Sequence, residues 1–322
     1  MRPCWGGTMP RLITSSLLAG LLLSSKLSAQ DISTETESAR VDEEVIVRGR
    51  RLGELEFDIR PYIRDFLDEI TLPARGRGYA RWHRRVCVGV QNLENRPAQF
   101  IVDRVSSLAL DVGLEPGEPG CNPQVIIIFS TDAKQMAAGM VENEPRVFRP
   151  IAGYAGMDRG LEGLDFFVES EAPVRWWDVS MPVDVRTGNP AIQSNNVSCT
   201  RAPYCFPIFW VDGPSRVHSG VRDDLQYVII LVDVTKLNGT TWRQLGDYLA
   251  FVSLAQIDLN ADPAEYDSIL NLFSNPAAYS GLTDWDRQFI HALYRFNPER
   301  VARVQGNEIV SRIAKQELTE AQ

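Results

Sequence analysis

The stretch LQYVIILVDVTKLNGTTWRQLGDYLAFVSL, residues 225–254, contains the two segments that decide the fold. Its first part, LQYVIILVD (225–233), is an almost unbroken apolar run, which is typical of a strand buried on both faces. We therefore predict a central strand of a sheet. After the turn NGTT, Thr240 or Thr241 can cap a helix. The apolar face of that helix consists of Leu245, Tyr248, Leu249 and Val252.

The other helices and strands follow one another without a strict alternation. Apolar residues at helical spacing predict helices over three ranges: 58–70, 95–112, and a segment that Ser130 or Thr131 caps and that runs to about Val141. Runs of β-branched and aromatic residues predict strands over 86–90, 124–129, 174–179 and 205–211. We therefore predict an α/β (α+β) fold with helices packed on a mixed, twisted sheet.

The first residues have the pattern of an export signal. Arg2 and Arg11 precede an apolar run over 17–23, and the sequence LSA then ends at Ala29. This pattern predicts a cleaved signal peptide over 1–29. The apolar run is shorter than the roughly 20 residues that cross a bilayer, so we expect no membrane span after cleavage.

The rest of the chain is expected to have two parts. Residues 30–55 begin with the polar, acidic sequence QDISTETESARVDEE and are predicted to be a disordered leader. Residues 56–318 are predicted to form a single globular domain. The mature protein is expected in the periplasm or outside the cell.

Four cysteines lie beyond residue 29, namely Cys87, Cys121, Cys199 and Cys205. An exported chain favours disulfides over free thiols. Of the three possible connectivities we favour Cys87 with Cys121 and Cys199 with Cys205. A zinc site is the alternative, but neither a CxxC pair nor a nearby histidine accompanies these cysteines.

The charge of the chain bears on its partners. The formal net charge is -9, and it becomes -12 when the three basic residues of 1–29 are removed. Nucleic acid and anionic membrane surfaces attract basic proteins. We therefore expect no nucleic-acid partner, and instead an envelope protein or ligand whose identity the sequence does not specify.

Two segments near the C-terminus carry a recognisable pattern. Ser268, Ile269 and Leu270 form a possible turn, and LTDWDRQFIHALY (282–294) forms a possible helix. Together they resemble the zinc proteases of the metzincin group and related zincins, in which a SIM turn precedes a helix of the form LTxxDxxxIxxLY. The matching positions of the helix are Leu282, Thr283, Asp286, Ile290, Leu293 and Tyr294. The resemblance implies a zincin-like domain.

The same resemblance assigns roles on the helix that precedes the turn, where zincins carry HExxHxxGxxH. Its register places Gly246, Ala250 and Gln256 at the three histidine positions, Asp247 at the general-base glutamate and Ser253 at the glycine. A catalytic zinc needs three donor side chains, and neither glycine nor alanine offers one. We therefore predict no metal and no cofactor, and a degenerate domain in which the small residues serve packing.

Other candidate groups are scattered. His83, His218 and His291 have no metal-type partner at short spacing, so we interpret them as structural or surface residues. The sequence contains no phosphate loop and no dinucleotide fingerprint.

The segments ARWHRRVCVGV (80–90) and QLGDYLAFVSLAQID (244–258) are similar to segments of exported proteins of alphaproteobacteria. That similarity implies no activity. The leading hypothesis is a non-catalytic, zincin-like binding or structural protein of the envelope. The alternative is a hydrolase that uses carboxylates around Asp247, with Asp233 and Asp258 as possible partners.

Overall fold

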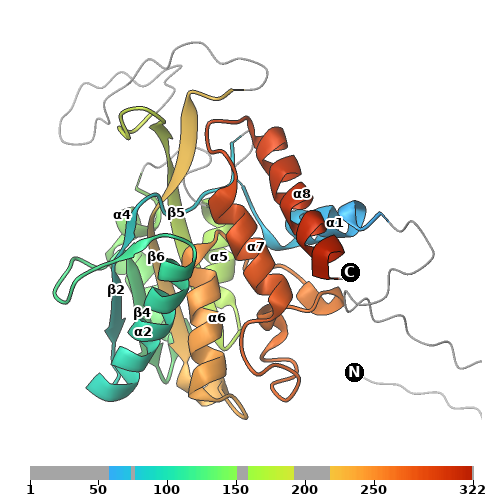
Figure 1. The fold of residues 1–322 in the computed structure, drawn as a ribbon. Coiled ribbons are helices and arrows are strands. Elements are labelled where there is room, and N and C mark those ends of the chain that lie inside the picture. The colour runs from blue at the N-terminus through green and yellow to red at the C-terminus, as the bar shows by residue number, and fades with distance from the viewer. Residues whose placement is uncertain (1–57, 74–76, 151–158, 192–217, 321–322) are drawn as a thin grey trace, which may run out of the picture. The chain divides into compact units, whose positions relative to one another are not determined.

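The computed structural model describes residues 58–73, 77–150, 159–191 and 218–320, which all belong to one compact unit. Its centre is a four-stranded sheet with the spatial order β2 (Val88–Gln91), β4 (Val125–Ser130), β6 (Val221–Asp233) and β5 (Val174–Asp184). The first three strands are parallel, and β5 runs antiparallel to β6 (Figure 1). The predicted α/β fold with a mixed sheet is confirmed.

The predicted central strand is β6, which extends from 225–233 back to Val221. It lies between β4 and β5, and Ile230 of β6 pairs with Ile127 of β4. Helices cover both faces of β4 and β6, which explains why these two strands are continuously apolar.

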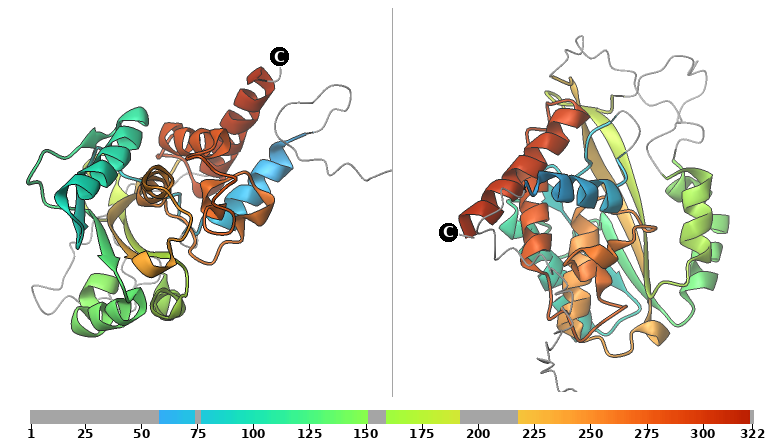
Figure 2. Two further views of the ribbon diagram at one scale, coloured as in Figure 1. Left: turned by 90° about the horizontal axis from the view of Figure 1, so that it is seen from below. Right: turned by 90° about the vertical axis from the view of Figure 1, so that its right-hand side faces the viewer.

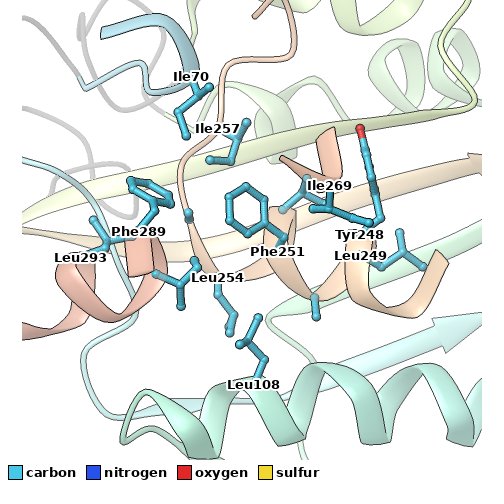
Figure 3. Packing of buried hydrophobic residues seen from close by; sticks show 14 of the residues in the cluster. Ile70, Leu108, Tyr248, Leu249, Phe251, Leu254, Ile257, Ile269, Phe289 and Leu293 are labelled. Carbon is cyan, nitrogen blue, oxygen red and sulfur yellow. The ribbon is translucent and has the colours of Figure 1, made fainter. Parts of the chain in front are cut away.

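One face of the sheet is covered by α2 (Asn95–Asp111) and α6 (Trp242–Leu254) (Figure 2). The same core continues into α1 (Arg60–Ile70), α7 (Asp284–Arg295) and α8 (Ala302–Glu320). Phe251 of α6 contacts Phe289 of α7, with ring centroids 5.8 Å apart (Figure 3). The predicted helices over 58–70 and 95–112 are confirmed, and the first buries its apolar face through Ile63, Phe66, Leu67 and Ile70.

The opposite face is covered by α3 (Ala133–Asn143), α4 (Pro145–Phe148) and α5 (Gly160–Glu169) (Figure 2). Phe148, Phe167 and Trp177 form an aromatic cluster there, with ring centroids 5.6–6.2 Å apart. The sequence pattern did not predict α4, α5 or α8. In α5, Gly160 and Gly163 weaken the local helix signal, and burial of Leu164 and Phe167 against the sheet stabilises the helix instead.

A short parallel pair, β1 (Arg85–Val86) and β3 (Glu115–Pro116), lies beside the predicted disulfide. Cys87 and Cys121 are bonded, with their Cα atoms 6.2 Å apart. Cys87 also separates β1 from β2, so the single strand expected over 86–90 is two short strands. Cys199 and Cys205 lie outside the described residues, as do the strand predicted over 205–211, the signal peptide and the leader.

The cap of α3 was predicted wrongly. Its N-cap is Asp132, whose carboxylate accepts a hydrogen bond from the backbone N–H of Gln135 at 2.9 Å. Ser130 instead bonds the backbone N–H of Asp132 through its hydroxyl. The strand predicted over 174–179 is correct but continues to Asp184. Among the described residues, no helix is long and apolar enough to cross a membrane.

Candidate functional site

Helix α6 begins at the capping box that Thr241 forms with Gln244, as one of the two predicted caps. Every side chain from Gln244 to Leu254 is buried, so helices, sheet and loops surround α6. The chemistry of each position therefore depends on which neighbour it faces.

The side of α6 that carries the zincin-matched positions faces α2. A Cβ atom added to Gly246 would lie 2.9 Å from Cγ of Arg104 and 3.5 Å from the ring of Phe100, and both residues belong to α2. Helical spacing places Ala250 and Ser253 on the same side. These two residues are 1% and 0% exposed. The small residues thus allow two helices to approach closely.

Asp247 joins three parts of the structure. Its Oδ1 accepts hydrogen bonds from Nε of Arg104 at 2.7 Å and from Nη2 of the same residue, and its Oδ2 accepts from the backbone N–H of Leu282 at 3.2 Å. The side chain of Asp247 is only 2% exposed. This carboxylate links α2, α6 and the turn before α7, which is a structural role.

Gln256, at the third histidine position, belongs to a buried polar cluster under β5. Its Nε2 donates to Oδ2 of Asp178 at 2.7 Å. Arg159 donates to Oδ1 of Asp178 at 2.6 Å and to Oδ1 of Asp258 at 3.1 Å, and it is only 5% exposed. The guanidinium therefore neutralises much of the negative charge of these two carboxylates.

The turn that resembles the SIM motif is held by Asp286. Ser268 donates its hydroxyl to Oδ1 of Asp286 at 2.6 Å, and the backbone N–H of Ile269 donates to Oδ2 at 2.8 Å. Thr283 and Asp286 form a capping box at the start of α7. Burial raises the pKa of Asp286 to about 6, although these donors favour the charged form. This contact fixes the short helix η3 (Ile269–Asn271) against α7.

A cleft of about 510 Å³ opens between the start of β5, one side of α6 and the segment 258–279. That segment contains η2 (Pro263–Glu265) and η3. The aromatic part of the lining consists of Trp176, Tyr248, Phe273 and Tyr279. Trp176 is held in place because its indole N–H donates to the backbone oxygen of Ile257 at 2.9 Å. Tyr248 lies edge-on to Phe273, with ring centroids 4.9 Å apart.

Tyr248 comes from the side of α6 that faces this cleft, and Figure 3 shows it at the other end of the core from Phe289. The residue is 5% exposed, and burial raises the pKa of its hydroxyl above the ordinary tyrosine value. Within the described part of the chain, this hydroxyl makes no hydrogen bond. The hydroxyl is not among the described buried polar atoms that lack a partner, so it is open to the cleft and can donate to a bound molecule.

The charged residues that line the cleft are Asp258 and Asp262. No lysine, arginine or histidine among the described residues lines it. Asp258 forms an ion pair with Arg159, and Asp262 is exposed. The wall therefore combines aromatic faces with negative charge.

The remaining predicted candidates lie apart from the cleft. His83 is exposed, His218 contacts Arg300 at 3.1 Å, and His291 contacts Asp111 at 2.9 Å. Asp233 accepts hydrogen bonds from the backbone and hydroxyl of Thr235 and so caps the short helix η1 (Val234–Lys236). The described residues contain no group of three His, Cys, Asp or Glu side chains placed to hold a metal ion.

The aromatic residues of the 143–222 segment can, from the sequence, line a groove or belong to the core, and the core was the favoured interpretation; Trp176 and Tyr248 line the cleft instead. Tyr248 was predicted as part of the apolar face of α6, and the WW pair at 176–177 as part of a strand. Successive side chains of a strand point to opposite faces, so the adjacent pair at 176–177 indicates one tryptophan on each face of β5. Trp176 lines the cleft, and Trp177 belongs to the core on the opposite face.

No family model matches the chain, and neither the curated proteins nor the solved structures contain a significant match.

Proposed function

We propose that this chain is an exported, non-catalytic binding protein with a zincin-like domain. Its ligand occupies the cleft between β5, α6 and 258–279, and has an apolar body together with a positively charged group. The observation that carries the proposal is the unpaired hydroxyl of Tyr248 inside an aromatic-lined cleft.

The shape and lining of the cleft support a ligand of modest size. About 510 Å³ is within the range of small-molecule and short-peptide sites. Trp176, Tyr248 and Phe273 offer aromatic faces, which bind apolar groups and also attract cations. The Tyr248 hydroxyl supplies one directional hydrogen bond to an acceptor of the ligand.

The charge of the lining supports a cationic group. Asp258 and Asp262 are the charged residues at the wall, and Arg159 is buried behind Asp258. Arg159 offsets much of the charge of Asp258, so the exposed carboxylate of Asp262 is the negative charge that an anionic ligand would meet. A ligand that carries an ammonium or guanidinium group meets complementary charge.

The non-catalytic part of the proposal is supported by the residues at the zincin-matched positions. Gly246 and Ala250 lack donor atoms and lie on the side of α6 that faces α2. Asp247 is bound to Arg104 and to the backbone of Leu282, so it is not available as a general base.

The test uses two N-acetylated dipeptide amides, Phe-Lys and Phe-Glu, as probes of opposite charge. Binding to the disulfide-bonded protein is measured by isothermal titration calorimetry. We expect the lysine peptide to bind about ten-fold more tightly, and Tyr248→Phe to weaken it about three- to ten-fold through loss of one hydrogen bond.

Tyr79→Phe is the matched control, because the Tyr79 hydroxyl also has no hydrogen bond within the described residues and lies outside the cleft. It should leave the affinity unchanged. Equal affinities for the two peptides, unaffected by Tyr248→Phe, would contradict the proposal.

A further inference from the structure

A second concave site lies between α7 and α8. It has a volume of about 300 Å³ and shares no lining residue with the aromatic cleft. Its basic residues are Arg295 near the end of α7, and Arg312 and Lys315 on α8. Gln288 and His291 of α7 also line this groove.

The three basic side chains have no acidic partner among the residues that the structure describes. Arg295, Arg312 and Lys315 are exposed, and none forms an ion pair or a hydrogen bond through its side chain within the described residues. The chain has 42 acidic and 33 basic residues, so an unbalanced basic cluster runs against its overall charge. Such a cluster attracts anions.

The acidic groups close to this groove are already bound to other groups. Asp111 of α2 contacts Nε2 of His291 at 2.9 Å. Glu317 of α8 accepts a hydrogen bond from Nε2 of Gln288 at 2.6 Å. Among the ion pairs of the described residues, none joins either carboxylate to Arg295, Arg312 or Lys315.

Gln288 adds a second and independent observation. It is 2% exposed, and its amide orientation is set because Nε2 donates to the Glu317 carboxylate. Its Oε1 atom is buried and has no hydrogen-bond donor among the described residues. A buried acceptor without a donor is unfavourable, and because Gln288 lines the groove, a molecule bound there can supply the donor.

We propose that the groove binds phosphate, either as the free ion or as a phosphomonoester. Guanidinium groups bind phosphate oxygens through paired hydrogen bonds, and lysine adds a point charge. The second pKa of a phosphomonoester is about 6, so below that pH phosphate keeps a P–O–H group. That hydroxyl can donate to Oε1 of Gln288, which a fully ionised oxyanion cannot do.

The protonation requirement separates this proposal from simple charge attraction. Sulfate carries no proton between pH 5 and 7 and has a charge of at least the same size as phosphate. Attraction by charge alone therefore favours sulfate, whereas the Gln288 acceptor favours phosphate. A higher affinity for phosphate than for sulfate therefore indicates a hydrogen bond to Gln288, and not attraction by charge alone.

The experiment measures binding of inorganic phosphate and of sulfate to the disulfide-bonded protein at pH 5.5, by calorimetry at constant ionic strength. We expect phosphate to bind at least about five-fold more tightly than sulfate. The double variant Arg312→Gln/Lys315→Gln should lose about ten-fold or more in phosphate affinity. Methyl phosphate distinguishes the two sources: tighter binding than the free ion indicates an ester ligand, and weaker binding indicates free phosphate.

Arg96→Gln is the control, because Arg96 is exposed on α2, forms no ion pair within the described residues and does not line the groove. Its affinity should equal that of the wild type. Circular dichroism verifies the fold of each variant, and Arg295→Gln replaces the double variant if that variant does not fold. Equal affinities for phosphate and sulfate, or phosphate binding that survives removal of the basic residues, would overturn the proposal.

Discussion

The two sides of α6 differ in what they meet. The side with Gly246, Asp247 and Ala250 lies against α2 and the turn at Leu282, where side chains and backbone fill the space. The side with Tyr248 borders the cleft formed with β5 and 258–279. Two of the three residues at zincin histidine positions, Gly246 and Ala250, therefore lie on the packed side of α6, and the side that borders the cleft carries Tyr248, which has no counterpart in the zincin motif.

This difference separates two uses of buried polar groups. The Asp247 carboxylate is saturated by Arg104 and Leu282, and it contributes to stability. The Tyr248 hydroxyl has no partner within the described residues, and it contributes to binding in the function proposed above. Substitutions on the α2 side should change stability, whereas substitutions on the cleft side should change ligand affinity.

The largest effect is expected for Asp247→Ala. Removal of this carboxylate leaves Arg104 and the Leu282 N–H without their acceptor, which should destabilise the protein by about 3 to 4 kcal/mol. Arg104 is 29% exposed and can regain water, so the lower end of that range is expected. Urea unfolding measures the loss. Asp103→Ala, at an exposed position of α2, should stay within about 0.5 kcal/mol, and a similar small change for Asp247→Ala would refute the structural role.

A second effect concerns Asp286, which binds Ser268 and Ile269 directly before the cleft-lining residue Leu270. Burial raises its pKa to about 6 from an ordinary value of 3.8, so its contribution to stability is present below about pH 4 and is lost as the pH rises through 6. Asparagine does not titrate. The advantage of wild type over Asp286→Asn should therefore shrink by about 2 to 3 kcal/mol between pH 4 and pH 7.

Urea unfolding at pH 4, 5, 6 and 7 follows this difference for the two proteins. An advantage of the wild type that grows with pH would mean that the Ser268, Ile269 and Thr283 donors outweigh burial.

Ala250→Leu tests the packed side of α6 more directly. The added atoms enter a position that is 1% exposed, so the variant should lose about 2 kcal/mol through overpacking. Ala277→Leu, at an exposed position, is the control. Urea unfolding compares the two variants, provided that their m-values are equal. An unchanged midpoint for Ala250→Leu would mean that the space beside Ala250 is open and not packed.

The smallest stability effect is expected on the cleft side. Tyr248→Phe removes a hydroxyl that bonds nothing in the described residues, so stability should change by less than about 0.5 kcal/mol. The same variant should lose affinity in the peptide assay above. A loss of stability similar to that of Ala250→Leu would show that the hydroxyl is a structural group, and the two sides of α6 would no longer differ.

Much of the fold was predictable because its signals are local. The apolar run of β6 and the cap at Thr241 depend on residues close in sequence. The Cys87–Cys121 bond was also predicted, although its geometry depends on the β1–β3 pair. By contrast, α5 was missed because its stability comes from contacts with the sheet rather than from local propensity.

The sequence by itself determined the strand β6 and the helices α1, α2 and α6, and it determined that Gly246 and Ala250 offer no ligand atoms. These properties follow from residue type and from periods of two and 3.6 residues. Only the tertiary structure decided that Asp247 is a structural partner of Arg104, that Tyr248 borders a cleft, and that Arg295 lies beside Arg312. Each of these depends on segments distant in sequence that pack side by side, and short-range patterns carry no information about that packing.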